Sequence, residues 1–297
     1  MQNNRRKPVV VGIGELLWDM LPSGKKAGGA PINFVYHASQ LGAEGYAVSA
    51  VGNDDLGNEL LHELEANSIQ HIIEKVPYPT STVQIFLKDG IPNYEIKESV
   101  AWDYLALTTK IIDLVEDADA ICFGTLGQRF KQSKDTIQRI LSFVSEDAYR
   151  VFDINLRQHY YTKELIEESL YLANVFKIND EELLIVKDLF QLDGTEKETV
   201  HWFMEHYNLR MVVLTAGASC STIYTKEEVS ILPTPKVEVV DTVGAGDAFI
   251  GALIVSLLKG ASLREAHECA VEIATYVCTQ EGAWPTYKDK INKEGCF

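Results

Sequence analysis

The stretch Asp241-Thr-Val-Gly-Ala-Gly-Asp-Ala-Phe-Ile-Gly-Ala-Leu253 carries the strongest structural signal in this sequence. Its small residues Gly244, Ala245 and Gly246 precede an apolar run that is typical of a buried helix. Small residues let the chain turn tightly and direct free N–H groups at one point, where the helix N-terminus adds partial positive charge. The stretch therefore predicts an anion-binding site at the start of a helix, suited to a phosphate group.

Asp247 directly follows these small residues, although a carboxylate there would repel a bound phosphate. One explanation is that Asp247 is a general base that takes a proton from an attacking hydroxyl group. The alternative is a helix N-cap, because aspartate is favoured at that position. The stretch by itself leaves both explanations open.

A second glycine-rich stretch, Gly28-Gly-Ala-Pro-Ile-Asn33, also stands where a helix begins. Its paired glycines allow a ligand to approach the backbone closely, and Asn33 offers a donor and an acceptor to hydroxyl groups. Asp19, on the strand-like residues 15–21, can accept two hydroxyl bonds. This pattern suits a polyol ligand. The alternatives are an ordinary loop with Asn33 in solvent and an exposed strand aspartate.

Outside these stretches, short β-branched runs alternate with amphipathic segments. Strands are expected at residues 8–12, 46–51, 120–124, 150–154, 175–178 and 211–215. Helices are expected at residues 32–41, 57–67, 132–145, 162–173, 181–189 and 195–207. Because such alternation is typical of βαβ units, we predict a mostly parallel sheet with helices on both faces.

One region interrupts the alternation. Residues 80–88 and 93–97 read as two strands joined by Asp89-Gly90-Ile91-Pro92, with no helix between them. We expect an antiparallel flap inserted into the domain.

Length and composition narrow the possible classes of protein. The 297 residues are 46% hydrophobic and 24% charged, as in ordinary folded globular proteins. A net charge of −16 argues against nucleic acid and anionic membranes as partners. The longest apolar run, residues 248–258, is too short to span a bilayer, so we expect no membrane span. The basic residues 5–7 are followed by an apolar run that stops at Gly12, which is too short for a signal peptide, so we expect a cytoplasmic protein. Five scattered cysteines predict reduced thiols and no zinc site: Cys122, Cys220, Cys269, Cys278 and Cys296.

Two common nucleotide-binding motifs are absent. A P-loop requires a lysine, and none follows Gly246. The dinucleotide fingerprint requires a third glycine, but Leu17 follows Gly12-Ile-Gly14 at that position, and Phe249 follows Gly244-Ala-Gly246.

Together the two glycine-rich stretches resemble the two signature motifs of the ribokinase-like PfkB family of sugar kinases. They occur in the family's order, with Gly42 and Gly52 after the first, and the strand–helix alternation matches over nearly the whole chain. The resemblance implies a ribokinase-like three-layer α/β fold and a single kinase domain over residues 1–297. It also implies a small antiparallel β-lid from about residues 14–21 and 80–107, which would exclude water and which forms a homodimer contact in relatives.

The resemblance assigns roles to residues of both stretches. Asp247 matches the catalytic base, and the anion hole corresponds to Gly244, Ala245 and Gly246. Four residues near the N-terminus would hold the sugar: Asp19, Gly28, Gly29 and Asn33.

On the nucleotide side, Asn179-Asp-Glu-Glu182 resembles the family's Asn-x-x-Glu motif, which organises Mg²⁺ and the ATP phosphates, with Glu182 acting indirectly. Without the resemblance, Asn179 reads as a helix cap followed by acidic residues. Thr215-Ala-Gly217 resembles the nucleotide loop, and the resemblance also assigns Gly246 to nucleotide binding. This chain has Cys220 where the family usually has a second glycine.

A monovalent-cation site, with K⁺ as the expected ion, is implied at Asp241, Val243 and the backbone near Gly282. Most of its ligands would be main-chain oxygens, so the sequence hardly tests it.

The substrate is indicated by Asp153-Ile-Asn-Leu-Arg157, which is similar to a segment of fructokinases and of 2-keto-3-deoxygluconate kinases. Trp102, after the flap, also resembles a fructokinase feature. We therefore expect ATP-dependent phosphorylation of a primary hydroxyl group, with fructose as first choice. Ribokinase, 2-keto-3-deoxygluconate kinase and nucleoside kinase remain open, as does a surface ion pair for Arg157. A sugar-binding regulator without turnover is the alternative from another class, and the retained Asp247 argues against it.

Overall fold

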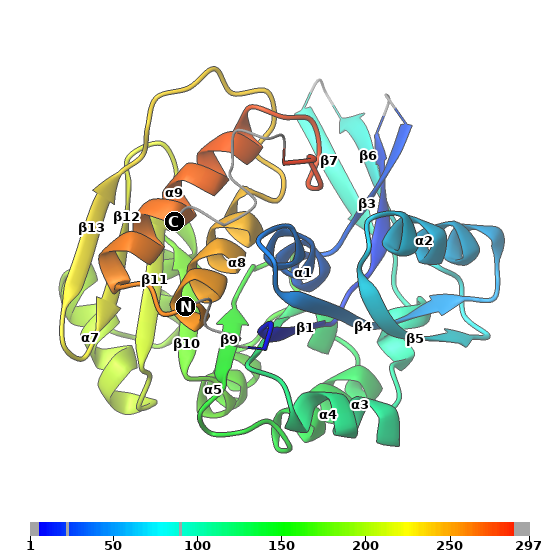
Figure 1. Cartoon of the computed structure of the whole chain (residues 1–297), viewed down its shortest axis with the longest axis horizontal. Helices are drawn as coiled ribbons and strands as arrows, with labels where there is room; N and C mark the ends of the chain where they lie inside the picture. The colour runs from blue at the N-terminus through cyan, green and yellow to red at the C-terminus, as the bar shows by residue number, and fades with distance from the viewer. Residues whose placement is uncertain (1–5, 22–23, 89–90, 288–297) are drawn as a thin grey trace.

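The computed structural model describes residues 6–21, 24–88 and 91–287. Within these ranges, nine strands form one sheet (Figure 1). In spatial order they are β13 (Val229–Pro233), β12 (Cys220–Thr225), β11 (Met211–Ala216), β10 (Val175–Asn179), β9 (Tyr149–Asp153), β8 (Ala120–Gly124), β1 (Val9–Ile13), β4 (Glu44–Gly52) and β5 (Gln70–Val76). All neighbours from β11 to β5 pair in parallel, and β12 and β13 add an antiparallel edge. The mostly parallel sheet is thus confirmed, with all six predicted strands in it.

Helices cover both faces of this sheet, as predicted (Figure 1). One face carries α1 (Ala30–Gln40), α2 (Asp55–Ala66), α8 (Ala245–Leu258) and α9 (Leu263–Cys278). The other carries α3 (Thr109–Glu116), α4 (Lys131–Leu141), α5 (Lys163–Leu172), α6 (Asp180–Leu189) and α7 (Glu196–His206). Adjacent strand residues such as Val10 and Val11 belong to opposite apolar clusters, because side chains alternate across a strand.

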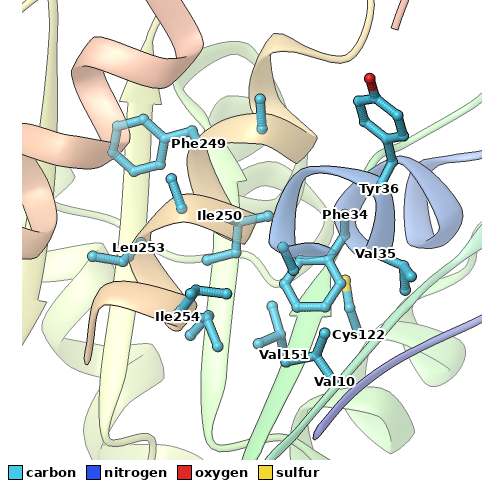
Figure 2. Packing of buried hydrophobic residues seen from close by; sticks show 14 of the residues in the cluster. Val10, Phe34, Val35, Tyr36, Cys122, Val151, Phe249, Ile250, Leu253 and Ile254 are labelled. Carbon is cyan, nitrogen blue, oxygen red and sulfur yellow. The ribbon is translucent and has the colours of Figure 1, made fainter. Parts of the chain in front are cut away.

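The contact between α1 and α8 positions the site. Figure 2 shows Ile250 of α8 on the side toward Phe34 of α1, near Val10 and Val151 of the sheet, whereas Phe249 lies on the other side of α8, against His267 of α9. The helices approach closely, since a Cβ atom on Gly251 would lie 3.1 Å from the carbonyl oxygen of Phe34. Burying each large apolar side chain contributes about 1.5–3 kcal/mol, so this seam holds the starts of the two helices together.

A second sheet has four strands among the described residues, in the order β3 (Gly24–Gly28), β2 (Leu17–Leu21), β6 (Ser81–Lys88) and β7 (Ile91–Ile96). A small second sheet is therefore present where the lid is expected, but it is not purely antiparallel. It consists of two antiparallel hairpins whose first strands, β2 and β6, lie side by side in parallel. Residues 101–104 form a 3₁₀ turn rather than part of the lid sheet. The predicted turn residues Asp89 and Gly90 lie outside the described residues.

Cys269 is disulfide-bonded, which corrects the prediction of a reduced thiol there, because the spacing of scattered cysteines does not reveal pairing. Cys122, Cys220 and Cys278 are free. In the described part of the chain, no helix combines the length and apolar character needed to cross a membrane.

Candidate active site

Asp247 and Asn33 meet where α8 and α1 begin. The Nδ2 atom of Asn33 donates a hydrogen bond to Oδ2 of Asp247 (2.8 Å), and its Oδ1 accepts one from Nε1 of Trp284 (2.7 Å). Because the indole can only donate, it fixes the amide so that the NH₂ group faces Asp247. The N-cap of α8 is Gly244, so the helix-cap alternative for Asp247 is wrong.

Gly244 begins α8 in the left-handed conformation, with φ of 78°. A Cβ atom there would lie 2.8 Å from the Cβ atom of Ala283, so both conformation and space require glycine. Ala245 and Gly246 follow in the first turn. The predicted combination of small residues at a helix start is therefore present.

A buried ion pair lies below this turn. Lys177 of β10 approaches both oxygens of Asp153 on β9, at 3.0 and 2.9 Å, and both side chains are less than a tenth exposed. Burial raises the pKa of Asp153 to about 6, although Lys177 opposes the rise. Burial lowers the pKa of Lys177, but the surrounding carboxylates, Asp153 first, outweigh it and raise the pKa above its ordinary value. The sequence interpretation assigned no role to Lys177.

Glu15, just after β1, is a second residue that the sequence interpretation missed. Its side chain is buried, and its Oε2 atom has no hydrogen-bond partner. Burial raises the pKa of Glu15 to about 7, with Asp247 contributing to the rise and backbone N–H groups opposing it. A Cβ atom on Gly127 would lie 3.2 Å from Oε2. Glu15 therefore belongs to the same charged cluster as the predicted base.

The predicted sugar-binding residues lie on β2 and its loop. Asp19 is half-buried, and burial raises its pKa to about 6, with Arg157 opposing the rise. A Cβ atom on Gly28 would lie 2.7 Å from Oδ2 of Asp19. A Cβ atom on Gly29, where φ is 122°, would lie 2.1 Å from the carbonyl oxygen of Glu15. The two glycines thus allow Asp19 and Glu15 to approach the loop that leads to Asn33.

Arg157 and Trp102 differ in their placement. Arg157 is exposed and donates to the carbonyl oxygen of Leu156 (3.0 Å), and its charge acts on both Asp19 and Asp247. Trp102 is 1% exposed and packs in an apolar cluster, with the Arg129 guanidinium 4.0 Å from the centre of its ring. Its role as a sugar contact is therefore corrected, since a buried ring has no surface to offer a ligand.

At the start of α6, Asn179 and Glu182 form a reciprocal capping box, with bonds of 2.7 and 3.0 Å. The other carboxylate oxygen of Glu182 accepts from the backbone N–H of Leu156 (2.9 Å). Both oxygens are thus occupied by the backbone. Among the described residues, no group of three or more histidine, cysteine, aspartate or glutamate side chains is arranged to hold a metal ion.

The other predicted positions lie at a strand end and on a loop. Thr215 is the second-last residue of β11, Gly217 in the following turn has a φ of 48°, and Cys220 is the first residue of β12. The Asp241 carboxylate accepts from the backbone N–H groups of Val243 and Gly282, both at 3.0 Å. The structure therefore brings together the three positions named for the cation site.

The sequence matches the pfkB family carbohydrate kinases over residues 23–289. This chain belongs to that family. It is therefore a sugar kinase, a phosphotransferase whose acceptor is an alcohol group.

Among the relatives of this kinase is an uncharacterized sugar kinase, PH1459, from Pyrococcus horikoshii. It is 29% identical over 96% of this chain and 95% of its own length, and its structure aligns with a TM-score of 0.83. A fructokinase of Rhizobium leguminosarum bv. trifolii is 27% identical over 84% of this chain and 79% of its own. The ATP-bound fructokinase of Xylella fastidiosa shares the fold, with a TM-score of 0.82 over 94% of each chain at 19% identity.

This kinase also has a cavity of about 430 Å³. Its lining includes Gln128, Arg129 and His159, and it contains none of the predicted site residues. Arg129 is paired with Asp103, and Lys134 with Glu168. The lining cations are thus engaged by carboxylates of this chain.

Proposed function

We propose that this kinase transfers the γ-phosphate of ATP to a primary hydroxyl group of a free monosaccharide, and that fructose is its substrate. The observation that carries the proposal is the Asn33–Asp247 contact at the glycine-rich start of α8. A carboxylate that is held from one side by an amide keeps lone pairs for the sugar hydroxyl. Burial raises the pKa of Asp247, which strengthens it as a base.

In the proposed reaction the sugar hydroxyl oxygen attacks the γ-phosphorus, its proton passes to Asp247, and ADP leaves. Asp19 and Asn33 hold the sugar, and the first turn of α8 stabilises negative charge on the transferred group. Mg²⁺ supplies further charge stabilisation when it is bound with ATP. Mg²⁺ takes phosphate oxygens and water readily, so Glu182, whose oxygens accept backbone N–H groups, fits an indirect role.

Fructose is supported by the Asp153–Arg157 segment and by the fructokinase names of several relatives. The exposed Arg157 also favours a second candidate, a sugar acid such as 2-keto-3-deoxygluconate, because a guanidinium pairs well with a carboxylate. We also propose a K⁺ site near Asp241. Replacing K⁺ with Na⁺ in the assay tests it.

The test is ADP release with ATP and fructose, ribose, glucose, 2-keto-3-deoxygluconate or adenosine. We expect fructose to give the highest kcat/KM, and Asp247→Asn to lower kcat about 100-fold or more. Asp188→Asn, an exposed change on α6, is the matched control and should retain activity. If the wild-type enzyme prefers the sugar acid, and Arg157→Ala loses only the activity toward that acid, the sugar acid replaces fructose as the proposed substrate.

A further inference from the structure

The side chain of Lys177 reaches the underside of the first turn of α8. A Cβ atom on Gly246 would lie 2.9 Å from its Nζ atom, so the absence of a side chain at Gly246 makes room for the ammonium group. Lys177 and Asp153 are also directly paired in the parallel register of β9 and β10. Cross-strand pairing and the glycine above therefore determine where the ammonium group lies.

A buried ion pair is seldom the most stable way to fill such a position. Removing two charges from water is costly, and an apolar pair of similar size often stabilises a fold as well or better. Here both side chains are less than a tenth exposed, and the pair lies at the carboxyl ends of two central strands, next to the proposed base. This placement points to a role in the site rather than in the core.

The charged and titratable groups around Asp247 come from several elements. Lys177 of β10 and Arg157, after β9, favour its ionised form. The Asp247 charge in turn raises the pKa values of Asp153, Glu15 and Cys122, which lie around it. Lys177 is the foremost of the favourable charges, and it is the one with a fixed, buried position.

We propose that Lys177, whose place the strand register and Gly246 determine, is a positioning residue that keeps Asp247 ionised and adds positive charge to the anion site at the start of α8. The inference rests on the proposed function, in which Asp247 is the base. Lys177 acts through Asp247 and the helix start rather than as a catalytic residue.

The test compares the pH dependence of kcat/KM in wild type, Lys177→Met and Asp153→Asn, with the best sugar substrate. Loss of activity at acidic pH reports protonation of Asp247. Lys177→Met should move this acidic limb upward by about one pH unit or more, with activity recovering at higher pH. Asp153→Asn should move it downward, because a negative neighbour is removed. Shifts in the same direction, or no shift, would overturn the proposal.

A double variant keeps the test decisive if either single variant does not fold. In that case Lys177→Met/Asp153→Asn, which buries no unpaired charge, replaces the single variant. Its acidic limb should lie above that of wild type, and an unchanged limb would overturn the proposal.

Calorimetric titration with MgATP needs no sugar, so it separates this inference from the choice of substrate. Lys177→Met should weaken MgATP binding about 10-fold or more, whereas Asp153→Asn should not weaken it. Equal weakening by both would mean a merely structural role. A wild-type enzyme that phosphorylates no sugar would refute the proposed function, and the calorimetric result would still decide the question of added charge.

Discussion

At the residue scale, the orientation of one amide group determines which atoms face the proposed base, Asp247. Asn33 has both ends of its amide occupied, by Asp247 and by Trp284. If the amide turned over, its oxygen would face the Asp247 carboxylate and repel it. The indole N–H of Trp284, outside both glycine-rich stretches, is therefore part of the site.

Trp284→Phe should remove this constraint while keeping an aromatic ring against Tyr36, on which Trp284 stacks at 5.3 Å. Leaving the amide oxygen without its donor costs about 1–3 kcal/mol, so kcat/KM should fall about 5- to 150-fold, and Tm should also fall because the unpaired oxygen is buried in the folded enzyme. Steady-state kinetics and thermal unfolding measure the two effects. Trp202→Phe, on α7 at the opposite face, is the matched control. Equal activity of the two variants would contradict the role of Trp284.

At the element scale, the start of α8 requires a glycine at position 244 for two reasons, the left-handed backbone and the short distance to Ala283. Gly244→Ala should cost about 1–2 kcal/mol for its left-handed backbone, and more for the contact with Ala283. Gly42→Ala provides the comparison, because Gly42 has a φ of 89° but only an ordinary contact, 3.6 Å from Nζ of Lys259.

Urea unfolding should therefore show a larger loss for Gly244→Ala than for Gly42→Ala, and only Gly244→Ala should weaken MgATP binding. Equal losses of stability with unchanged nucleotide binding would show that the helix start tolerates a side chain.

The elements that the sequence predicted best are those in which every residue fits the same secondary structure and the same burial. Strand β8 was predicted at its observed bounds, since all five of its residues are buried. Strand β5 was missed because it lies at the sheet edge with a mixed burial pattern. Strand β3, Gly-Lys-Lys-Ala-Gly, has low strand propensity and forms through its pairing with β2. The helices α3 and α9 were also not predicted.

The site residues also divide into those with a local sequence signal and those without one. Asp247 and Asn33 belong to local motifs, and the structure brings them into contact. Lys177 and Glu15 lie on apolar strand-like segments where the sequence offers no local signal for a charged role. Their significance comes from burial and from neighbours distant in the chain, which only the packed structure specifies.

At the scale of the whole molecule, the charged cluster affects stability. The chain has a net charge of −16, yet burial raises the pKa values of Glu15, Asp19 and Asp153 to about 7, 6 and 6. A carboxyl group whose pKa is raised on folding binds more protons in the folded state. The stability of the fold therefore falls as the pH rises from the unfolded-state pKa to the folded-state pKa of that group. Ionised carboxylates at the site are thus maintained at a cost to the fold.

Glu15→Gln should make this cost measurable. For Glu15 the interval runs from its ordinary pKa of 4.5 to about 7, so the penalty is absent below that interval and complete above it. At about 1.4 kcal/mol per unit of pKa, Glu15→Gln should be more stable than wild type at pH 8 by on the order of 3 kcal/mol. The difference should shrink as the pH falls and vanish near pH 4. Urea unfolding across this range measures it, with the exposed Glu116→Gln as control. A stability difference that does not change with pH would mean that folding does not raise the pKa of Glu15.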